Sequence, residues 1–220
     1  MEDVLDLYAL PYDARYPQVC FDESPYQLVS EVRPPLPLRP GQPVCTDYEY
    51  KREGTVNLFL LVQPLTGWRQ VTVTAQRTAH DFAHQMQALV DQVFPHAETI
   101  RVVLDQLNTH SPSALYQTFS PAEARRLTRK LEFHYTPKHG SWLDMAECEF
   151  AVLKKQCLDR RLPTSTVLQQ EIAAWQANRN HRKVKINWTF ATTDARQKLQ
   201  RLYPPLPSPT PLAAQPSLAA

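Results

Sequence analysis

Glycine is scarce in this chain, with only four among 220 residues. The phosphate-binding loops of P-loop and dinucleotide-binding proteins need closely spaced glycines, and the sequence has no such cluster. It also lacks an apolar run of the roughly 18 residues that a membrane helix requires, and acidic residues follow Met1. We therefore expect no nucleotide-binding loop, signal peptide or membrane span, and a cytoplasmic location.

Cysteine is also scarce. The four cysteines form no C-x-x-C pair, which argues against a zinc site or a disulfide framework. We interpret them as reduced thiols of a cytosolic protein. They are Cys20, Cys45, Cys148 and Cys157.

Proline, in contrast, is abundant, with 20 residues. Because proline lacks a backbone donor and has a fixed φ, the stretch "RPPLPLRPGQP" (33–43) is predicted to be an extended loop. Residues 204–220 are rich in proline and nearly uncharged, and we predict that this tail is disordered.

Charge is distributed unevenly between the two halves of the chain. Residues 1–100 contain 7 Lys and Arg against 13 Asp and Glu, a net charge of −6, whereas residues 101–220 contain 17 against 9, a net charge of +8. Each basic cluster could be an ordinary solvated helix face or part of a surface that binds a polyanion. Four clusters in one half favour nucleic acid as the partner; they lie at 124–130, 154–155, 159–161 and 179–185.

Hydrophobic patterning predicts an α/β fold. Two β-rich runs joined by "LTG" indicate a hairpin, and the near-continuous apolar run "TIRVVLDQ" indicates a strand covered on both faces. Antiparallel strands followed by β-α-β units imply a mixed central sheet of about five strands flanked by helices. The predicted strands are 18–24, 55–64, 68–75, 99–106 and 132–137, and the predicted helices are 78–94, a helical region around 112–130, one beginning at 141, 164–178 and 193–202.

Three acidic residues stand out against this framework. Asp22 and Asp105 each end an apolar strand, so their carboxylates would converge at one sheet edge if the two strands are adjacent and parallel. Glu147 would lie about 40° from Leu143 on the apolar face of the helix that begins at 141. Glu149 would point toward the other side of that helix, so neutralising it should cost little stability or activity.

Three converging carboxylates repel one another unless cations neutralise them. Oxygen ligands alone suit a hard divalent ion such as Mg²⁺ or Mn²⁺. Two such ions about 4 Å apart could activate a water or a 3′-hydroxyl and stabilise the leaving oxygen of a phosphodiester. Isolated acids at strand ends occur in many proteins, so spacing alone leaves a structural role open.

Several polar residues near these acids have alternative interpretations. Strand alternation places Glu23 on the face opposite Asp22, which indicates a structural role. Asn108 and His110 closely follow Asp105 and could orient a ligand, a water or a phosphate, or could simply cap the loop. Lys138 and His139 precede the helix that carries Glu147 and could contact DNA phosphate, or could be solvated surface residues.

Four stretches together resemble a known family, the mariner-like bacterial insertion-sequence transposases of the DDE superfamily of endonucleases. They are "CFDES", "VVLDQLNTH", "FHYTPKHGSWLDMAECEF" and "NWTFATTDARQKLQRLYP". The resemblance implies an RNase H-like catalytic domain over 16–203, preceded by an N-terminal arm at 1–15.

It also implies a catalytic, metal-binding triad of Asp22, Asp105 and Glu147 with two Mg²⁺ (or Mn²⁺) ions. Members of this family cut DNA at transposon ends and join the 3′-hydroxyl to target DNA, usually at TA. Two positions depart from the family pattern, because Gln106 and Asp144 each stand where the family has Asn.

Such transposases normally carry helix-turn-helix units before the catalytic domain, whereas the first predicted strand here begins at residue 18. We therefore expect a separately encoded helix-turn-helix subunit to recognise the transposon ends, and a homodimer to hold two of them. The alternatives are a non-catalytic DNA-binding remnant or regulator of a transposase, and an RNase H-like nuclease with another nucleic acid substrate.

Overall fold

The computed structural model describes residues 1–34, 40–41 and 47–203. The predicted tail at 204–220 and most of the predicted proline-rich loop at 33–43 lie outside these ranges. Within them, no helix is long and apolar enough to cross a membrane. The three cysteines that they contain are free thiols, namely Cys20, Cys148 and Cys157.

A mixed five-stranded sheet forms the centre of the fold, with the strand order β3-β2-β1-β4-β5. β1 pairs antiparallel with β2 and β2 antiparallel with β3, whereas β1, β4 and β5 are parallel. The predicted mixed sheet of about five strands is therefore confirmed. The strands are β1 (Gln18–Glu31), β2 (Tyr50–Gln63), β3 (Trp68–Thr74), β4 (Ile100–Leu104) and β5 (Leu131–Tyr135).

Alternating side chains of these strands supply two hydrophobic cores, one on each face of the sheet. In β2, Leu58 and Leu60 enter one core, and Phe59 and Leu61 enter the other. In β4, Val103 faces the first core, whereas its neighbours face the second. A strand buried on both faces needs a nearly continuous apolar sequence, which is what "IRVVL" provides.

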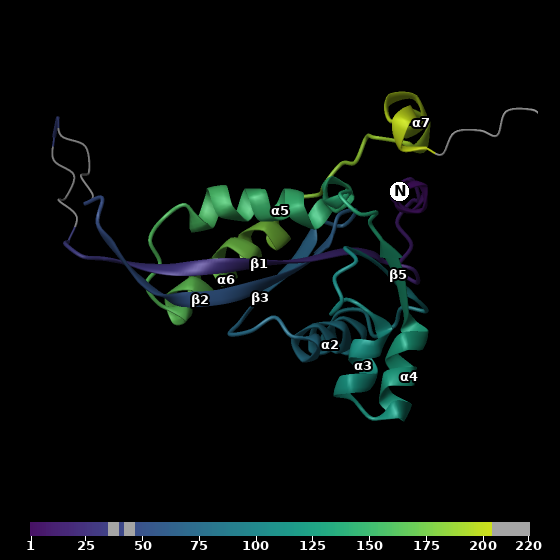
Figure 1. Ribbon diagram of the computed structural model, residues 1–220, viewed down its shortest axis with the longest axis horizontal. Coiled ribbons are helices and arrows are strands. Elements are labelled where there is room, and N and C mark those ends of the chain that lie inside the picture. Colours follow the sequence, from purple (N-terminus) through teal and green to yellow (C-terminus); the bar gives the residue numbers. More distant parts are fainter. Residues whose placement is uncertain (35–39, 42–46, 204–220) are drawn as a thin grey trace, which may run out of the picture.

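Helices cover both faces of the sheet (Figure 1). Helices α5 and α6 pack along one face, and α2, α3 and α4 cover the other. The helices are α1 (Glu2–Tyr8), α2 (Ala79–Ala88), α3 (Pro112–Thr118), α4 (Pro121–Lys130), α5 (Met145–Leu153), α6 (Ser165–His181) and α7 (Thr192–Lys198). Helices α2 and α5 each continue into a π-helical turn, at Leu89–Val93 and Lys154–Leu158, and two 3₁₀ turns lie at Ser141–Leu143 and Gln200–Leu202.

Helix α1 begins close to the N-terminus and packs into the α5 side of the core. Val4 and Leu5 are buried there, and Arg196 of α7 pairs with Glu2 at 2.8 Å. Residues 2–8 therefore pack against the domain that follows them.

Strand β1 is longer than the predicted 18–24. Beyond Ser24 it continues as a two-stranded ribbon with β2 that projects from the rest of the sheet (Figure 1). Most side chains of this ribbon are at least partly exposed, so it carries no apolar pattern that would have revealed it in the sequence.

Candidate functional site

The pairing of β1 with β4 brings two of the three predicted acids together. The strands are adjacent and parallel, as the sequence predicted, and Cys20 lies opposite Val103. Asp22 and Asp105 each follow two residues after this pair, so they stand level with each other. Because side chains alternate along a strand, Asp22 projects toward the α5 side, as Cys20 does. Asp105 lies just beyond the end of β4 and contacts His110, whose ring packs against Phe21 and Phe82 on the α2 side.

Helix α5, which packs against the face of the sheet toward which Asp22 projects, carries the third predicted acid, Glu147. Glu147 is exposed and, with Asp22, lines a cavity of about 280 Å³. The residues lining this cavity are Asp22, Glu23, Ser24, Glu147, Phe150, Ala151 and Lys154.

The orientation predicted for Glu147 and Glu149 is wrong. Glu147 faces the solvent-filled cavity, whereas Glu149 is only 1% exposed and lies on the inner face of α5. The prediction counted Leu143 as part of the helix, but α5 begins at Met145, after a 3₁₀ turn. With Met145 in place of Leu143, the buried positions centre on the side that carries Glu149.

Buried Glu149 forms an ion-pair cluster with two arginines from other elements. Its Oε1 lies 2.8 Å from Nε of Arg69 on β3, whose side chain is fully buried. Arg179 of α6 donates to both carboxylate oxygens, at 2.8 and 3.0 Å. The cluster ties α5 to the sheet and to α6, and thereby holds the helix that carries Glu147.

Asp144 begins helix α5 by capping it. Its side chain accepts a hydrogen bond from the backbone N–H of Ala146 at 2.9 Å. The cap is only 3% exposed, and burial raises the pKa of Asp144 well above its ordinary value, with a further contribution from the charges of Asp22, Glu147 and Asp105. The predicted helix start at Ser141 is therefore wrong by four residues.

The same concentration of negative charge acts on Asp22. Burial raises the pKa of Asp22 to about 7, and the charges of Glu147, Asp105 and Glu23 act in the same direction. In the described parts of the chain, no three His, Cys, Asp or Glu side chains are arranged closely enough to hold a metal ion. The donor set still fits a hard divalent cation, because it consists of carboxylate oxygens whose mutual repulsion a cation would relieve.

Asp105 is held by hydrogen bonds to a single oxygen. Oδ1 accepts the backbone N–H of Leu107 at 3.1 Å and lies 2.6 Å from Nδ1 of His110. The hydrogen bond to His110 lowers the pKa of Asp105. The other ring nitrogen of His110 lies 2.5 Å from Oε2 of Glu23, which projects to the α2 side of the sheet as strand alternation predicted.

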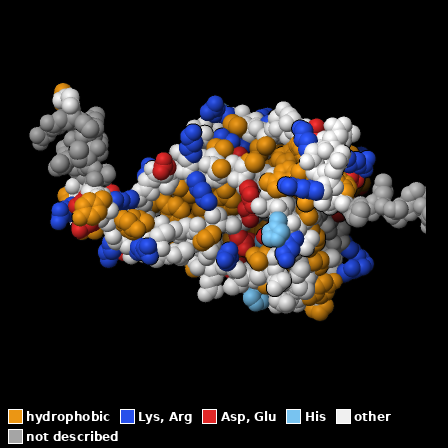
Figure 2. Space-filling view, turned by 45° about the horizontal axis from the view of Figure 1, so that its top comes forward, with side chains coloured by type: hydrophobic (Ala, Val, Ile, Leu, Met, Phe, Trp, Pro, Cys, Tyr) orange, Lys and Arg blue, Asp and Glu red, His pale blue; other side chains and the backbone are white. Residues whose placement is uncertain are grey.

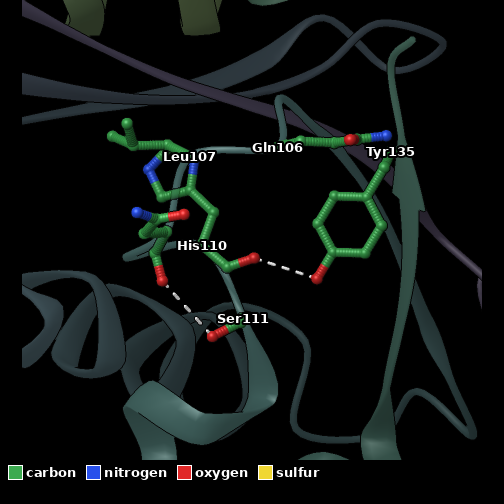
Figure 3. A pocket seen from close by; sticks show the side chains of 6 residues that line it. Gln106, Leu107, His110, Ser111 and Tyr135 are labelled. Carbon is green, nitrogen blue, oxygen red and sulfur yellow. Dashed lines mark hydrogen bonds between the residues drawn. The ribbon is translucent and has the colours of Figure 1, made fainter. Parts of the chain in front are cut away.

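The remaining predicted residues line two neighbouring cavities at the same edge of the sheet. Exposed Lys138 and His139 share one of about 380 Å³ with Asp105. Asn108 and His110 line one of about 420 Å³ together with Tyr135, whose hydroxyl donates to the backbone carbonyl of His110 at 2.9 Å (Figure 3). His110 is 1% exposed, so its ring contacts other side chains and not the surface.

Lys154 belongs to the basic cluster at 154–155, and the sequence analysis did not place it beside the acids. It is exposed and lines the cavity that contains Asp22 and Glu147. Because it follows Glu147 by seven residues, two helical turns place it on the same side of the helix, and this spacing could have revealed it. Its ammonium group brings a positive charge to the acidic cavity.

A family model described as "DDE superfamily endonuclease" matches residues 17–169 of this chain. This span includes all three predicted acids. No curated protein sequence matches the chain.

Solved structures of the Mos1 mariner transposase share this fold. A paired-end complex with Mn has 15% sequence identity and a TM-score of 0.51, with 82% of this chain and 55% of that chain covered. The strand transfer complex has 16% identity and a TM-score of 0.51, with 77% and 51% covered. A pre-cleavage transpososome has 14% identity and a TM-score of 0.51, with 79% and 57% covered. This chain therefore spans about half the length of the Mos1 chains, and the likeness concerns the fold.

Proposed function

We propose that this chain, which belongs to the DDE superfamily of endonucleases, is the catalytic part of a DNA transposase. The observation that supports the proposal is that Asp22 on β1 and Asp105, just after the parallel strand β4, stand level with each other near the helix that carries Glu147. The reaction is cleavage of DNA strands at the ends of an insertion sequence and transfer of the 3′ end to target DNA. The mariner transposase of similar fold has been crystallised in paired-end and strand transfer complexes, which supports this assignment.

Asp22, Asp105 and Glu147 are the residues that would hold Mg²⁺ or Mn²⁺, and we propose two ions. Bound ions of this kind supply an activated water or 3′-hydroxyl and stabilise the leaving oxygen of a phosphodiester. The raised pKa of Asp22, caused first by burial and then by the neighbouring acids, supports the assignment, because a bound cation would stabilise the buried carboxylate in its charged form. The Mn in a complex of the similar Mos1 protein agrees with it.

Cationic side chains around the acids would bind the DNA backbone. Lys154, at the start of the π-helical turn after α5, lines the acidic cavity, where it would contact the phosphate next to the cut. Lys138 and His139 are exposed beside Asp105, where they would contact a phosphate farther along the strand. Asn108, exposed on the loop after Asp105, would orient the DNA or a water.

The partners we propose are double-stranded DNA, a second copy of the chain and a helix-turn-helix module that recognises the transposon ends. Two copies would bring two DNA ends together, as the paired-end complexes of Mos1 contain two ends. The module would be a separately encoded subunit if it is not part of the same protein.

A DNA cleavage assay tests the proposed function. The wild-type chain, supplied with a helix-turn-helix module and duplexes from the DNA flanking its coding sequence, should nick the duplex in Mg²⁺ or Mn²⁺. Asp105→Asn should remove this activity without unfolding the protein, because Asp105 is half exposed. Cleavage of an RNA–DNA hybrid in preference to the duplex would instead identify another RNase H-like nuclease. Salt-dependent DNA binding without cleavage in either metal would identify a non-catalytic remnant.

A further inference from the structure

His110 lies between two carboxylates from different strands. Its Nδ1 is 2.6 Å from Oδ1 of Asp105, just after β4, and its Nε2 is 2.5 Å from Oε2 of Glu23 on β1. Ionised carboxylates only accept hydrogen bonds, so both ring nitrogens donate. One imidazole therefore connects a proposed metal ligand to a buried acid on the neighbouring strand β1.

The ring is fixed by packing as well as by these hydrogen bonds. Phe21 contacts it edge-on, with the ring centroids 5.2 Å apart, and the centroid of Phe82 lies 5.1 Å away. The hydroxyl of Tyr135 donates to the backbone carbonyl of His110, which anchors the loop itself (Figure 3). With a side chain that is 1% exposed, His110 has little freedom to leave this position.

Glu23 is an unusual residue to bury for stability alone. Its side chain is only 4% exposed. Among the described residues Oε1 accepts no hydrogen bond, and the nearest arginine, Arg77, is 3.9 Å away and half exposed. A buried carboxylate with so few partners costs folding free energy, so its hydrogen bond to His110 is its main compensation.

Both hydrogen bonds to Asp105 within the described chain end on Oδ1. That arrangement fixes the rotation of the carboxylate and leaves Oδ2 available to a cation. Groups that orient a metal-binding carboxylate in this way typically change metal affinity by about 10–100-fold when they are removed.

We propose that His110 and Glu23 are positioning residues for the metal site: Glu23 fixes the imidazole through Nε2, and Nδ1 of the imidazole fixes Asp105 for metal binding. The inference rests on the proposed function, in which Asp105 is a metal ligand. It assigns a functional role to Glu23, which the sequence pattern indicated to be structural.

Two substitutions of His110 separate positioning from packing. In His110→Asn the amide nitrogen replaces Nδ1 and can still donate to Asp105, whereas in His110→Gln it replaces Nε2 and can donate only to Glu23. Both variants lose the same ring contacts with Phe21 and Phe82. Titration of the full-length, metal-free protein with MnCl₂ in a calorimeter measures the affinity, and thermal unfolding measures the packing loss.

We expect His110→Gln to weaken Mn²⁺ binding by about 10-fold or more, and His110→Asn by clearly less, with similar losses of thermal stability. Equal Mn²⁺ affinities in the two variants would overturn the role of Nδ1. Asp105→Asn is the control for the metal site: if it binds Mn²⁺ like the wild type, the proposed function itself is wrong. If Asp105→Asn weakens Mn²⁺ binding and neither His110 variant does, the positioning role of His110 is wrong and the proposed function stands.

A second pair of variants tests Glu23 and applies even if the His110 variants fail to fold. Glu23→Gln keeps an oxygen that accepts from His110, whereas Glu23→Met has a similar size and no acceptor. Positioning predicts near wild-type Mn²⁺ affinity for the Gln variant and about 10-fold weaker binding for the Met variant. An equal loss in both would make Glu23 a direct ligand, and no loss in either would make it irrelevant to the metal; both results contradict the proposal.

Discussion

At the scale of single residues, two glutamates two positions apart on α5 have opposite roles. Glu147 faces the acidic cavity, and Glu149 is buried against Arg69 and Arg179. Glu149→Gln should lower the free energy of unfolding by about 3–5 kcal/mol, because the buried guanidinium of Arg69 loses its counter-charge. Glu147→Gln should leave stability intact and reduce DNA cleavage by orders of magnitude, because a metal ligand is lost. Urea unfolding and a cleavage assay measure the two effects.

Glu171→Gln provides the matched control for Glu149. It is also a helical glutamate paired with an arginine, Arg160, but both side chains are more than a third exposed. Neutralising it should change the free energy of unfolding by less than about 1 kcal/mol. Equal unfolding curves for the Glu149 and Glu171 variants would refute the structural role of the buried cluster.

The raised pKa of Asp22 predicts a pH dependence of stability in the metal-free protein. The pKa is 3.8 in an unfolded chain and about 7 in the folded protein, so the folded state binds the proton more tightly. This contribution is fully present below pH 3.8 and is lost as the pH rises through about 7. Asp22→Asn cannot ionise, so its stability relative to the wild type should increase over this range.

Urea unfolding of the wild type and Asp22→Asn at a series of pH values measures this effect. The difference between the two proteins at each pH isolates the contribution of Asp22 to the free energy of unfolding from that of other titrating groups. Addition of Mg²⁺ should stabilise the wild type above pH 7 and leave Asp22→Asn nearly unchanged. A difference between the two proteins that does not vary with pH would contradict the electrostatic account of the site.

The sequence predicted some residues of the site and not others for a physical reason. Asp22 and Asp105 lie near the ends of apolar strands, so the hydrophobic pattern was enough to predict that both are at one edge of the sheet. Whether Glu147 or Glu149 faces the core depended on where the helix begins, and a three-residue turn shifted that start. His110 follows Asp105 by only five residues, but its hydrogen bond to Glu23 joins positions 87 residues apart, and no local pattern encodes it.

At the scale of elements, Asp144 caps the start of α5, and its burial disfavours the charged form of its carboxyl group. Asp144→Asn keeps an oxygen for the N–H of Ala146 and removes the ionisable group whose pKa is raised by burial. This variant should be more stable than the wild type at neutral pH in the absence of metal. Asp144→Ala removes the cap and should be less stable than the Asn variant by about 1 kcal/mol.

Thermal unfolding of the three proteins at pH 5 and pH 8 tests this role of the cap. The raised pKa means that the wild type loses stability as the pH rises, so the advantage of Asp144→Asn should be larger at pH 8. An Asn variant that is less stable than the wild type at both values would show that the charge itself supports the helix.

The predictability of the elements followed their burial. The apolar run that became β4, the strand β3 and the buried end of β2 were predicted close to their observed limits, because core packing imposes a pattern on the sequence. The exposed start of β2, at Tyr50, lies five residues before the predicted one. The outer part of β1 and the short helix α1 were not predicted. The former is an exposed ribbon held by backbone pairing with β2, and the latter has too few turns to show a period.

At the scale of the whole molecule, acidic and basic side chains are arranged around the same site. Figure 2 shows Asp and Glu side chains gathered near the middle of one face, with Lys and Arg side chains distributed around them. The basic half of the sequence contributes Lys154 and Lys138 to the cavities at this edge of the sheet. Such an arrangement suits a phosphate backbone that passes over metal-binding acids.

This surface predicts DNA binding that depends strongly on salt and weakly on sequence. Each phosphate that a lysine or arginine neutralises releases a counterion, so a protein with about six such contacts loses about 10³ in affinity between 50 and 200 mM salt. Fluorescence anisotropy with unrelated duplexes should give similar affinities and a steep slope of log affinity against log salt concentration.

Two exposed neighbours on the turn after α5 provide a matched pair of variants, Lys154→Gln and Lys155→Gln. Each should reduce the salt slope by no more than about 1. Only Lys154→Gln should also slow cleavage at saturating DNA, because Lys154 alone of the two lines the acidic cavity. Affinity that is insensitive to salt, or equal cleavage by the two variants, would contradict this arrangement of the DNA.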